Sequence, residues 1–183
     1  MSQAASSHVA SQILSLHGER VILPNTAVAE IIPYVSPEAL SGAMGEKAPD
    51  WLLGMIAWRG ISIPLISMET IFGSSYEKPG KRSSIAIINA TGSAVAVPYF
   101  AVVTQGIPRL LQVSAETLGL IEETGETNKA VACHVVFDGD VAVIPDMDEV
   151  ESMIRNVFDS SAKSDKKKSA AKKNKNTSTK KKK

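Results

Sequence analysis

The sequence predicts a mainly β protein, built as a barrel or a sandwich of short strands. Over most of the first 145 residues, apolar and polar side chains alternate at short period, and Gly, Pro, Asn and Asp interrupt the pattern every few residues. That spacing is typical of short strands joined by turns. Only one segment, residues 146–158, repeats its apolar side chains at the helical spacing of three and four.

The first third of the chain predicts a hairpin followed by extended chain. Strands are expected at Ile13–Leu16 and Val21–Leu23, on either side of a turn at His17–Arg20. The chain then continues as extended structure over Val28–Val35. Ser36–Ala48 contains or adjoins several Gly and Pro residues, which favours a loop with at most one helical turn.

The segment Trp51–Gly73 is the most informative part of the chain. One cation, Arg59, interrupts its apolar run. A charge in such surroundings costs free energy unless it is paired or reaches the surface. Gly60 permits a turn that would carry the guanidinium outward, and Pro64, which has no backbone N–H, suits the edge of a sheet or a bulge. The segment therefore predicts two strands and a turn that presents one arginine.

The middle of the chain predicts a break and a second hairpin. Ser74–Arg82 is polar and is flanked by glycine, so it is a candidate boundary between two halves of the fold. A hairpin is expected from Ile85–Ile88 and Ala94–Val97, joined by a turn at Asn89–Ser93. Further short strands are expected at Val102–Thr104 and Leu110–Val113.

The end of the folded part carries the clearest local signals. Within Val131–Ile144, Asp138-Gly139 lies between two β-branched runs, and Asp-Gly favours the tight turn whose twist matches a hairpin. Asp146–Phe158 then predicts a helix with Asp146 as its N-cap. One face of this helix would be apolar, through Met147, Val150, Ile154 and Val157.

Charge divides the chain into an acidic body and a basic tail. Residues 1–158 hold 9 Lys and Arg against 17 Asp and Glu, a net charge of −8, whereas residues 159–183 hold 11 against 2, a net charge of +9. The tail has no Val, Leu, Ile or aromatic side chain, so it cannot offset the entropy of ordering and is expected to be disordered. A flexible N-terminus is expected over residues 1–12, which leaves residues 13–158 as the folded domain.

Cysteine use and hydropathy favour a cytoplasmic location. Cys133 is the one cysteine of the chain, so no disulfide can form within it, as is usual in a reducing compartment. Met1–Gln12 has no basic start followed by an apolar core, so we expect no signal peptide. No uncharged apolar run reaches the roughly 18–20 residues of a spanning helix, so we expect no transmembrane segment.

Residues 54–60 carry a family resemblance. The CheW-like chemotaxis adaptors, or coupling proteins, have a motif of glycine, two hydrophobic residues, asparagine, a hydrophobic residue and Arg-Gly, then a strand with proline and Asp-Leu. The chain resembles it in Gly54, Met55, Ile56, Trp58, Arg59, Gly60 and Pro64. Ala57 stands where asparagine is usual, and Ser67-Met68 stands where Asp-Leu is usual. A weaker similarity extends over about residues 15–155, including the last hairpin and the helix.

The resemblance implies both a fold and a role. The fold would be two small SH3-like β-barrel subdomains, divided near residues 74–82, with a short C-terminal helix. The role would be that of a non-enzymatic adaptor in a bacterial signalling system for swimming or for motility driven by type IV pili. Such an adaptor couples the cytoplasmic tip of a chemoreceptor to the regulatory domain of a sensor histidine kinase.

Arg59 and Trp58 are the candidate partner-binding residues, supported by Gly60 and Pro64. Arginine and tryptophan are both enriched among the residues that dominate interface energies. Judged without the resemblance, Arg59 equally suits a surface ion pair, and Trp58 suits a core as well as an interface. Trp51 is expected to pack in the core.

The sequence shows no catalytic constellation, and we expect no enzyme activity, metal or cofactor. His8, His17 and His134 have no spacing that would hold a metal together. Cys133 and His134 are neighbours in a predicted strand, so they point to opposite faces and do not form a nucleophile–base pair. The acidic pairs Glu122-Glu123 and Asp146/Asp148 are explained by loop solvation and helix capping, and no glycine-rich loop precedes a helix.

The Lys-rich tail supports an alternative function, as a polyanion-binding protein. Lysine clusters bind nucleic acid or anionic membrane surfaces through counterion release, and the absence of aromatic residues argues against recognition of base sequence. Two other interpretations of the tail are that it only increases solubility and is dispensable, or that it folds over the acidic body of the same molecule. The candidate polyanion-binding residues are Lys166, Lys167, Lys168, Lys172, Lys173 and Lys175, and Lys180–Lys183 form a third cluster.

Overall fold

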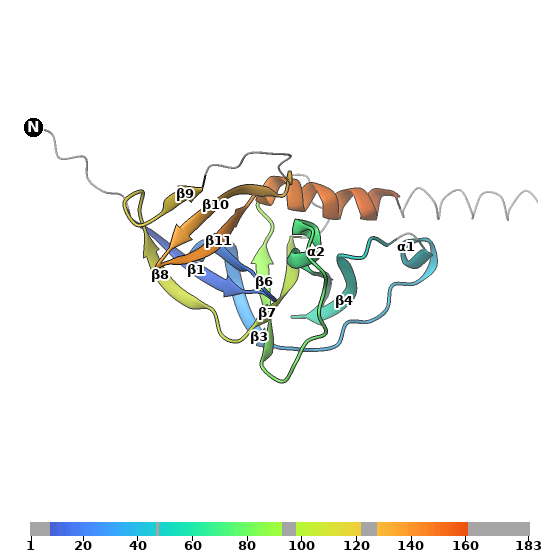
Figure 1. The fold of residues 1–183 in the computed structure, drawn as a ribbon. Helices are drawn as coiled ribbons and strands as arrows, with labels where there is room; N and C mark the ends of the chain where they lie inside the picture. Colours follow the sequence, from blue (N-terminus) through green and yellow to red (C-terminus); the bar gives the residue numbers. More distant parts are fainter. Residues whose placement is uncertain (1–7, 47, 93–97, 122–127, 161–183) are drawn as a thin grey trace, which may run out of the picture.

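Two sheets and a C-terminal helix are the main elements of the described part of the chain, which confirms the predicted mainly β fold (Figure 1). The computed structural model describes residues 8–160 except 47, 93–97 and 122–127. Sheet A has six strands in the order β8-β1-β2-β11-β10-β9. Its strands are β1 (Val9–Ser15), β2 (Arg20–Pro24), β8 (Arg109–Val113), β9 (Gly119–Ile121), β10 (Val131–Phe137) and β11 (Asp140–Pro145).

Sheet B has five strands in the order β3-β6-β7-β5-β4 and comes from one continuous stretch of chain. This stretch is inserted between β2 and β8 of sheet A, and the short 3-10 helix η1 (Asn25–Ala27) leads into it. Two short helices, α1 (Gly42–Glu46) and α2 (Met68–Phe72), lie in its connections. Its strands are β3 (Val28–Pro33), β4 (Leu52–Trp58), β5 (Ile61–Ile66), β6 (Ser83–Asn89) and β7 (Tyr99–Gln105).

The polar stretch at residues 74–82 does not separate the two sheets. It joins α2 to β6, and both of these belong to the inserted stretch that forms sheet B. The chain passes between the sheets near residues 25–27 and 106–108 instead. The composition of a segment predicts a loop, but which sheet its flanking strands join depends on pairing between residues far apart in the sequence.

The N-terminal strand begins earlier than the expected flexible segment 1–12 allows. β1 starts at Val9 and pairs on both sides, with Val9 opposite Val113 of β8 and Ser11 opposite Pro24 of β2. Backbone pairing on two sides orders residues whose side chains alone would not predict a strand. The hairpin predicted around a turn at His17–Arg20 is confirmed, since the Leu16 N–H donates to the Glu19 carbonyl at 2.8 Å, although Arg20 already belongs to β2.

The second predicted hairpin is formed with a later return strand. β6 pairs with Tyr99–Gln105, and Asn89 lies opposite Tyr99. Residues 93–97, which include the whole of the strand expected at Ala94–Val97, lie outside the described residues. The hairpin at Asp138-Gly139 is confirmed, and Asp140 lies opposite Phe137 across that turn.

Each sheet surrounds an apolar cluster of its own, and a third cluster lies between the sheets. Neighbouring side chains along a strand point to opposite faces, so one strand contributes to two clusters. On β1, for example, Ile13 packs within sheet A whereas Leu14 packs between the sheets. The sheet B cluster contains Ile56, Trp58, Ile63, Leu65, Ile85, Ile87, Ala101 and Val103.

The C-terminal helix covers the cluster between the sheets, as its apolar spacing predicts. It begins at residue 147 and is described to residue 160. The carboxylate of Asp146 accepts the Glu149 N–H at 3.0 Å, which confirms the predicted N-cap. Val150 and Ile154 are fully buried against both sheets, and Trp51 packs in the same cluster at 9% exposure. None of the described helices is long and apolar enough to cross a membrane.

Candidate functional site

The β4–β5 hairpin places Arg59 at an exposed tip. Trp58 and Ile61 lie opposite each other, and only Arg59 and Gly60 form the turn between them. Their φ angles are 47° and 80°, so both residues occupy the left-handed region. A two-residue turn with positive φ at both positions has the twist that matches a hairpin. The predicted strand–turn–strand is therefore confirmed, with the arginine at its tip.

The backbone of Arg59 is strained. Among the described residues, only Arg59 and Asp138 have a positive φ without being glycine. A non-glycine residue in the left-handed region costs about 1–2 kcal/mol, and Asp or Asn tolerates it better than Arg. Strain of this kind persists only where the surrounding structure imposes it, and it concentrates at functional sites.

Four side chains from three strands and the turn form a cluster beneath this tip, which we name the hairpin cluster. It consists of Glu30 on β3, Trp58 on β4, Arg59 in the turn and Tyr99 on β7. Arg59 Nη2 lies 2.9 Å from Glu30 Oε2, and Trp58 Nε1 donates to the same oxygen at 3.0 Å. The guanidinium carbon lies 4.8 Å from the centre of the Trp58 ring, and Tyr99 packs edge-on to that ring at 4.8 Å.

The hairpin cluster also closes sheet B on itself. β3 and β4 are the two edge strands of this sheet, and Glu30 on β3 bonds to Trp58 at the end of β4. Farther along β4, Met55 exchanges backbone hydrogen bonds with Glu38, at 2.8 and 3.1 Å. The first contact joins the two edge strands, and the second joins β4 to the chain that follows β3, so sheet B has the form of a small barrel around its cluster.

Gly54 makes the second of these junctions possible. A Cβ atom at this position would lie 2.4 Å from the carbonyl oxygen of Glu38 and 2.8 Å from Cβ of Pro37. Its φ of 145° lies in a region that other residues rarely adopt. The motif glycine is therefore required by the close approach of another backbone segment.

The structure separates the four predicted site residues into exposed and buried ones. The side chain of Arg59 is 69% exposed, and Gly60 is exposed beside it. Trp58 is only 8% exposed and belongs to the sheet B cluster. Pro64 is buried, just before the pairing of β5 with β7 begins at Leu65, so its missing N–H removes no bond from that ladder. The structure places Trp58 and Pro64 behind the surface that Arg59 and Gly60 present.

Sequence reasoning missed Glu30 and Tyr99. Glu30 is the one charged residue in the predicted extended stretch Val28–Val35, and that isolation could have drawn attention to it. Nothing in the sequence could have paired it with Arg59, which lies 29 positions later. The contact depends on the barrel closing.

The departure from the motif at Ser67 preserves its chemistry. The Thr70 N–H donates to Ser67 Oγ at 3.2 Å, so Ser67 is the N-cap of α2. Serine and aspartate are both preferred N-cap residues. Replacement of the usual aspartate by serine therefore keeps the start of this helix.

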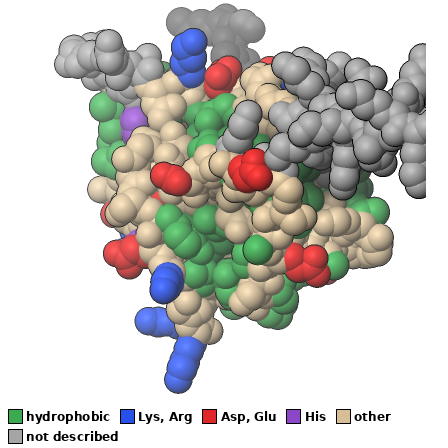
Figure 2. Space-filling model, turned by 90° about the vertical axis from the view of Figure 1, so that its right-hand side faces the viewer, with side chains coloured by type: hydrophobic (Ala, Val, Ile, Leu, Met, Phe, Trp, Pro, Cys, Tyr) green, Lys and Arg blue, Asp and Glu red, His purple; other side chains and the backbone are tan. Residues whose placement is uncertain are grey.

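A mainly apolar groove lies beside β3. It has a volume of about 770 Å³ and is lined by Ile31, Ile32, Pro33, Lys81, Arg82, Ser83, Ser84, Gly106 and Ile107. Ile107 is 86% exposed, in the connection that returns the chain to sheet A. Lys and Arg side chains gather at the lower end of the face drawn in Figure 2, where Figure 1 places the loop 74–82. The groove therefore combines apolar walls with a basic rim.

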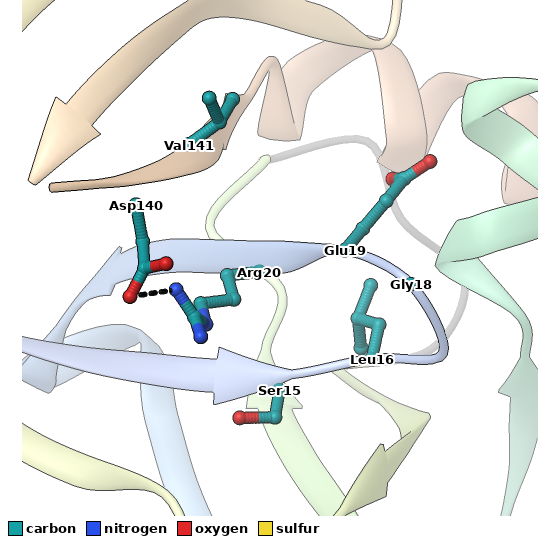
Figure 3. Close-up of a pocket in the computed structure, with 7 residues that line it drawn as sticks. All are labelled: Ser15, Leu16, Gly18, Glu19, Arg20, Asp140 and Val141. Carbon is teal, nitrogen blue, oxygen red and sulfur yellow. Dashed lines mark ion pairs between the residues drawn. The ribbon is translucent and has the colours of Figure 1, made fainter.

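A second, polar groove of about 500 Å³ lies between the β1–β2 turn and β11 (Figure 3). Arg20 of β2 forms an ion pair with Asp140 of β11 across it. Glu19 points away from that pair, and its Oε1 accepts a hydrogen bond from Ser74 Oγ at 2.6 Å. These polar groups serve contacts within the protein.

Within the described part of the chain, Cys133 and His134, the candidate nucleophile and base, lie on different faces of β10. No three His, Cys, Asp or Glu side chains within the described residues could hold a metal ion. Cys133 packs against the sheet A cluster, whereas His134 lies opposite Val143, whose side chain belongs to the cluster between the sheets. The two side chains therefore lie on opposite faces, as predicted. Glu122-Glu123 and the lysines of the tail lie outside the described residues.

Comparisons with known proteins agree with this architecture. The family model for the CheW-like domain matches residues 12–154. The structure is similar to the crystal structure of the scaffolding protein TtCheW from Thermoanaerobacter tengcongensis, with a TM-score of 0.61 and 19% sequence identity. That similarity covers 76% of this chain and 89% of the other. A search of curated proteins gives no match. The family match covers most of the chain, and the protein therefore belongs to the CheW-like domain family.

Proposed function

We propose that the protein is a non-enzymatic cytoplasmic adaptor that couples chemoreceptors to a sensor histidine kinase in a chemotaxis-type system, for swimming or for pilus-driven motility. Membership of the CheW-like family supports a scaffolding role. The observation that carries the proposal is the strained, exposed Arg59 at the tip of the β4–β5 hairpin. A residue that is unfavourable for its own backbone, yet exposed, is better explained by what it binds than by what it stabilises.

The kinase regulatory domain is the partner that we assign to the hairpin tip. Arg59 offers a guanidinium that can meet a carboxylate, and Ile61 beside the turn is 40% exposed. Ala57 and Ser62, which lie opposite each other next to the turn, are also exposed. The tip thus presents one cation among small and apolar groups, a combination that suits the centre of a protein interface.

The helical tip of a receptor is the partner that we assign to the groove beside β3. An amphipathic helix binds by laying its apolar side in such a groove. Ile31 and Ile107 supply apolar walls, while Lys81 and Arg82 at the rim complement acidic side chains of the helix. The groove and the hairpin tip involve different residues, so one adaptor can hold both partners together.

Coupling between the partners follows from differential binding. An adaptor that binds one state of the kinase more tightly than another shifts the kinase toward that state. Binding of the receptor then changes kinase activity only if it alters that preference, by a coupling free energy of typically about 1–3 kcal/mol.

The proposal is tested by variants that each weaken the binding of only one of the two partners. The purified chain is mixed with a kinase regulatory domain and with a soluble receptor tip fragment, and affinities are measured by calorimetry. Arg59→Glu should weaken kinase binding and leave receptor binding unchanged, whereas Ile107→Glu should do the reverse. Failure of the unmodified chain to bind either fragment contradicts the adaptor function. Equal loss of both partners in both variants contradicts the two-surface assignment.

A further inference from the structure

We propose that Trp58 is a positioning residue, which fixes the orientation of the Arg59 guanidinium for binding to an acidic side chain of the partner. This inference rests on the function proposed above. The family motif requires only an apolar residue at position 58. An aliphatic side chain there would fill the sheet B cluster, but it could form none of the polar contacts of the indole.

The indole of Trp58 positions the carboxylate of Glu30, which forms the ion pair with Arg59. Glu30 Oε2 accepts the Trp58 Nε1–H at 3.0 Å and lies 2.9 Å from Arg59 Nη2. The side chains of Arg59 and Glu30 are 69% and 38% exposed. An ion pair so exposed restrains its partners only weakly, because water competes with it and both side chains are long. The bond from a buried indole fixes one end of the pair.

The indole also contacts the guanidinium directly. Arg59 Cζ lies 4.8 Å from the centre of the ring, which is within the range of a cation–π contact. Trp58 is itself immobilised, since it is 8% exposed and has Tyr99 packed edge-on against it. Arg59 is therefore restrained twice by one rigid side chain, once through Glu30 and once through the ring face.

A side chain that is already restrained in the free protein binds its partner with higher affinity. Ordering a side chain with many rotamers at an interface weakens binding by a factor of about two to ten. A guanidinium that already has its bound orientation avoids most of that loss. The positive φ of Arg59 adds to this, because the turn fixes the direction in which the side chain leaves the backbone.

Two substitutions and two readouts test the proposal. Trp58→Phe keeps an aromatic ring but removes the N–H donor, and Trp58→Leu removes both contacts. The first readout is the ¹⁵N heteronuclear NOE of the Arg59 Nε–H, which reports side-chain mobility without a partner. We expect it to be high in the unmodified chain and to fall in both variants toward the value of Arg109, which is exposed on β8. The second is affinity for the kinase regulatory domain, which should fall about two- to tenfold in Trp58→Phe and further in Trp58→Leu.

Trp51→Phe is the matched control. Trp51 is also buried, at 9% exposure, but it packs between the sheets instead of in the sheet B cluster. Its substitution should lower the melting temperature without changing the Arg59 NOE or the affinity.

The outcomes separate this proposal from the proposed function. An unchanged NOE in both Trp58 variants, or a reduced NOE with unchanged affinity, overturns the positioning role of Trp58. Retained kinase binding in Arg59→Glu overturns the binding site itself.

Discussion

Two hairpins of this protein have the same turn and different chemistry. The β4–β5 turn has φ angles of 47° and 80° at Arg59 and Gly60, and the β10–β11 turn has 53° and 82° at Asp138 and Gly139. Both turns have glycine at the second position. They differ at the first position. Asp138 is suited to the left-handed region, whereas Arg59 is not.

This difference shows that the Asp138-Gly139 turn is favoured by its own residues, whereas the Arg59-Gly60 turn is imposed by the surrounding structure. Asp-Gly favours this turn by itself, because aspartate tolerates a positive φ and hydrogen-bonds to nearby backbone. Arginine has no such preference, and Arg59 is held instead by Glu30 and Trp58. The β10–β11 hairpin is therefore explained by folding alone. The β4–β5 hairpin depends in addition on the contacts of Arg59 with side chains that are distant in the sequence.

The largest effect is expected from substitution of Gly54, the glycine of the β4–β5 hairpin. Gly54→Ala on β4 should destabilise the protein by about 3 kcal/mol or more, because the new Cβ would meet the Glu38 carbonyl at 2.4 Å on a strained backbone. Gly119→Ala on β9 is the matched control. Its Cβ would make ordinary contacts of 3.7 and 3.8 Å with Val136, so a change within about 0.5 kcal/mol is expected. Urea unfolding of both variants measures the difference, and similar stability would contradict the proposed closure of sheet B.

Charge reversal at the first turn position should separate the hairpins by function. Arg59→Glu should weaken kinase binding by about 2 kcal/mol, or roughly thirty-fold, if Arg59 anchors the interface. It places a second carboxylate beside Glu30, but the exposure of the site should keep the loss of stability below about 1 kcal/mol. The same reversal at the other turn, Asp138→Lys, should leave kinase binding unchanged. Calorimetry and thermal melts on both variants decide this, and equal affinities would remove Arg59 from the interface.

Asparagine at the same positions should reveal the strain. Arg59→Asn should lose kinase affinity yet hold or gain about 0.5–1 kcal/mol in stability, because asparagine adopts a positive φ more easily than arginine. Asp138→Asn should change stability by less than about 0.5 kcal/mol, because aspartate already suits the turn. Chemical denaturation resolves these differences. A clear loss of stability in Arg59→Asn would mean that the ion pair with Glu30 contributes more than the strained backbone costs.

The smallest effect is expected from removal of the tail. A chain that ends at residue 160 retains both hairpins and the described C-terminal helix, so its melting temperature at moderate salt should lie within about 3 °C of the full chain. Any binding of the full chain to DNA or anionic vesicles should disappear with the tail and weaken steeply with salt, by about 0.9 in log–log slope for each phosphate contacted on a duplex. A large loss of stability would show instead that residues 161–183 contact the body.

Short-range patterns in the sequence determine several elements of the structure. The Asp138-Gly139 turn, the Asp146 N-cap and the apolar face of the C-terminal helix are each specified within a few neighbouring residues. A turn at Arg59-Gly60 was also predictable, because Gly60 permits one and a charge in an apolar run favours the surface, but the side chains that hold Arg59 there are distant in the sequence. The first three of these features follow from local propensity, which acts whatever the rest of the chain does.

Only the tertiary structure decides which strands pair and which side chains meet. The sequence marks residues 74–82 as a loop, but the loop joins parts of one sheet because β6 pairs with β3 and β7. Glu30 reaches Trp58 and Arg59 only because the edges of sheet B meet, and Pro64 is buried because β5 lies between β4 and β7. Contacts between distant residues depend on strand order, which is set by burial summed over the whole core and not by any one segment.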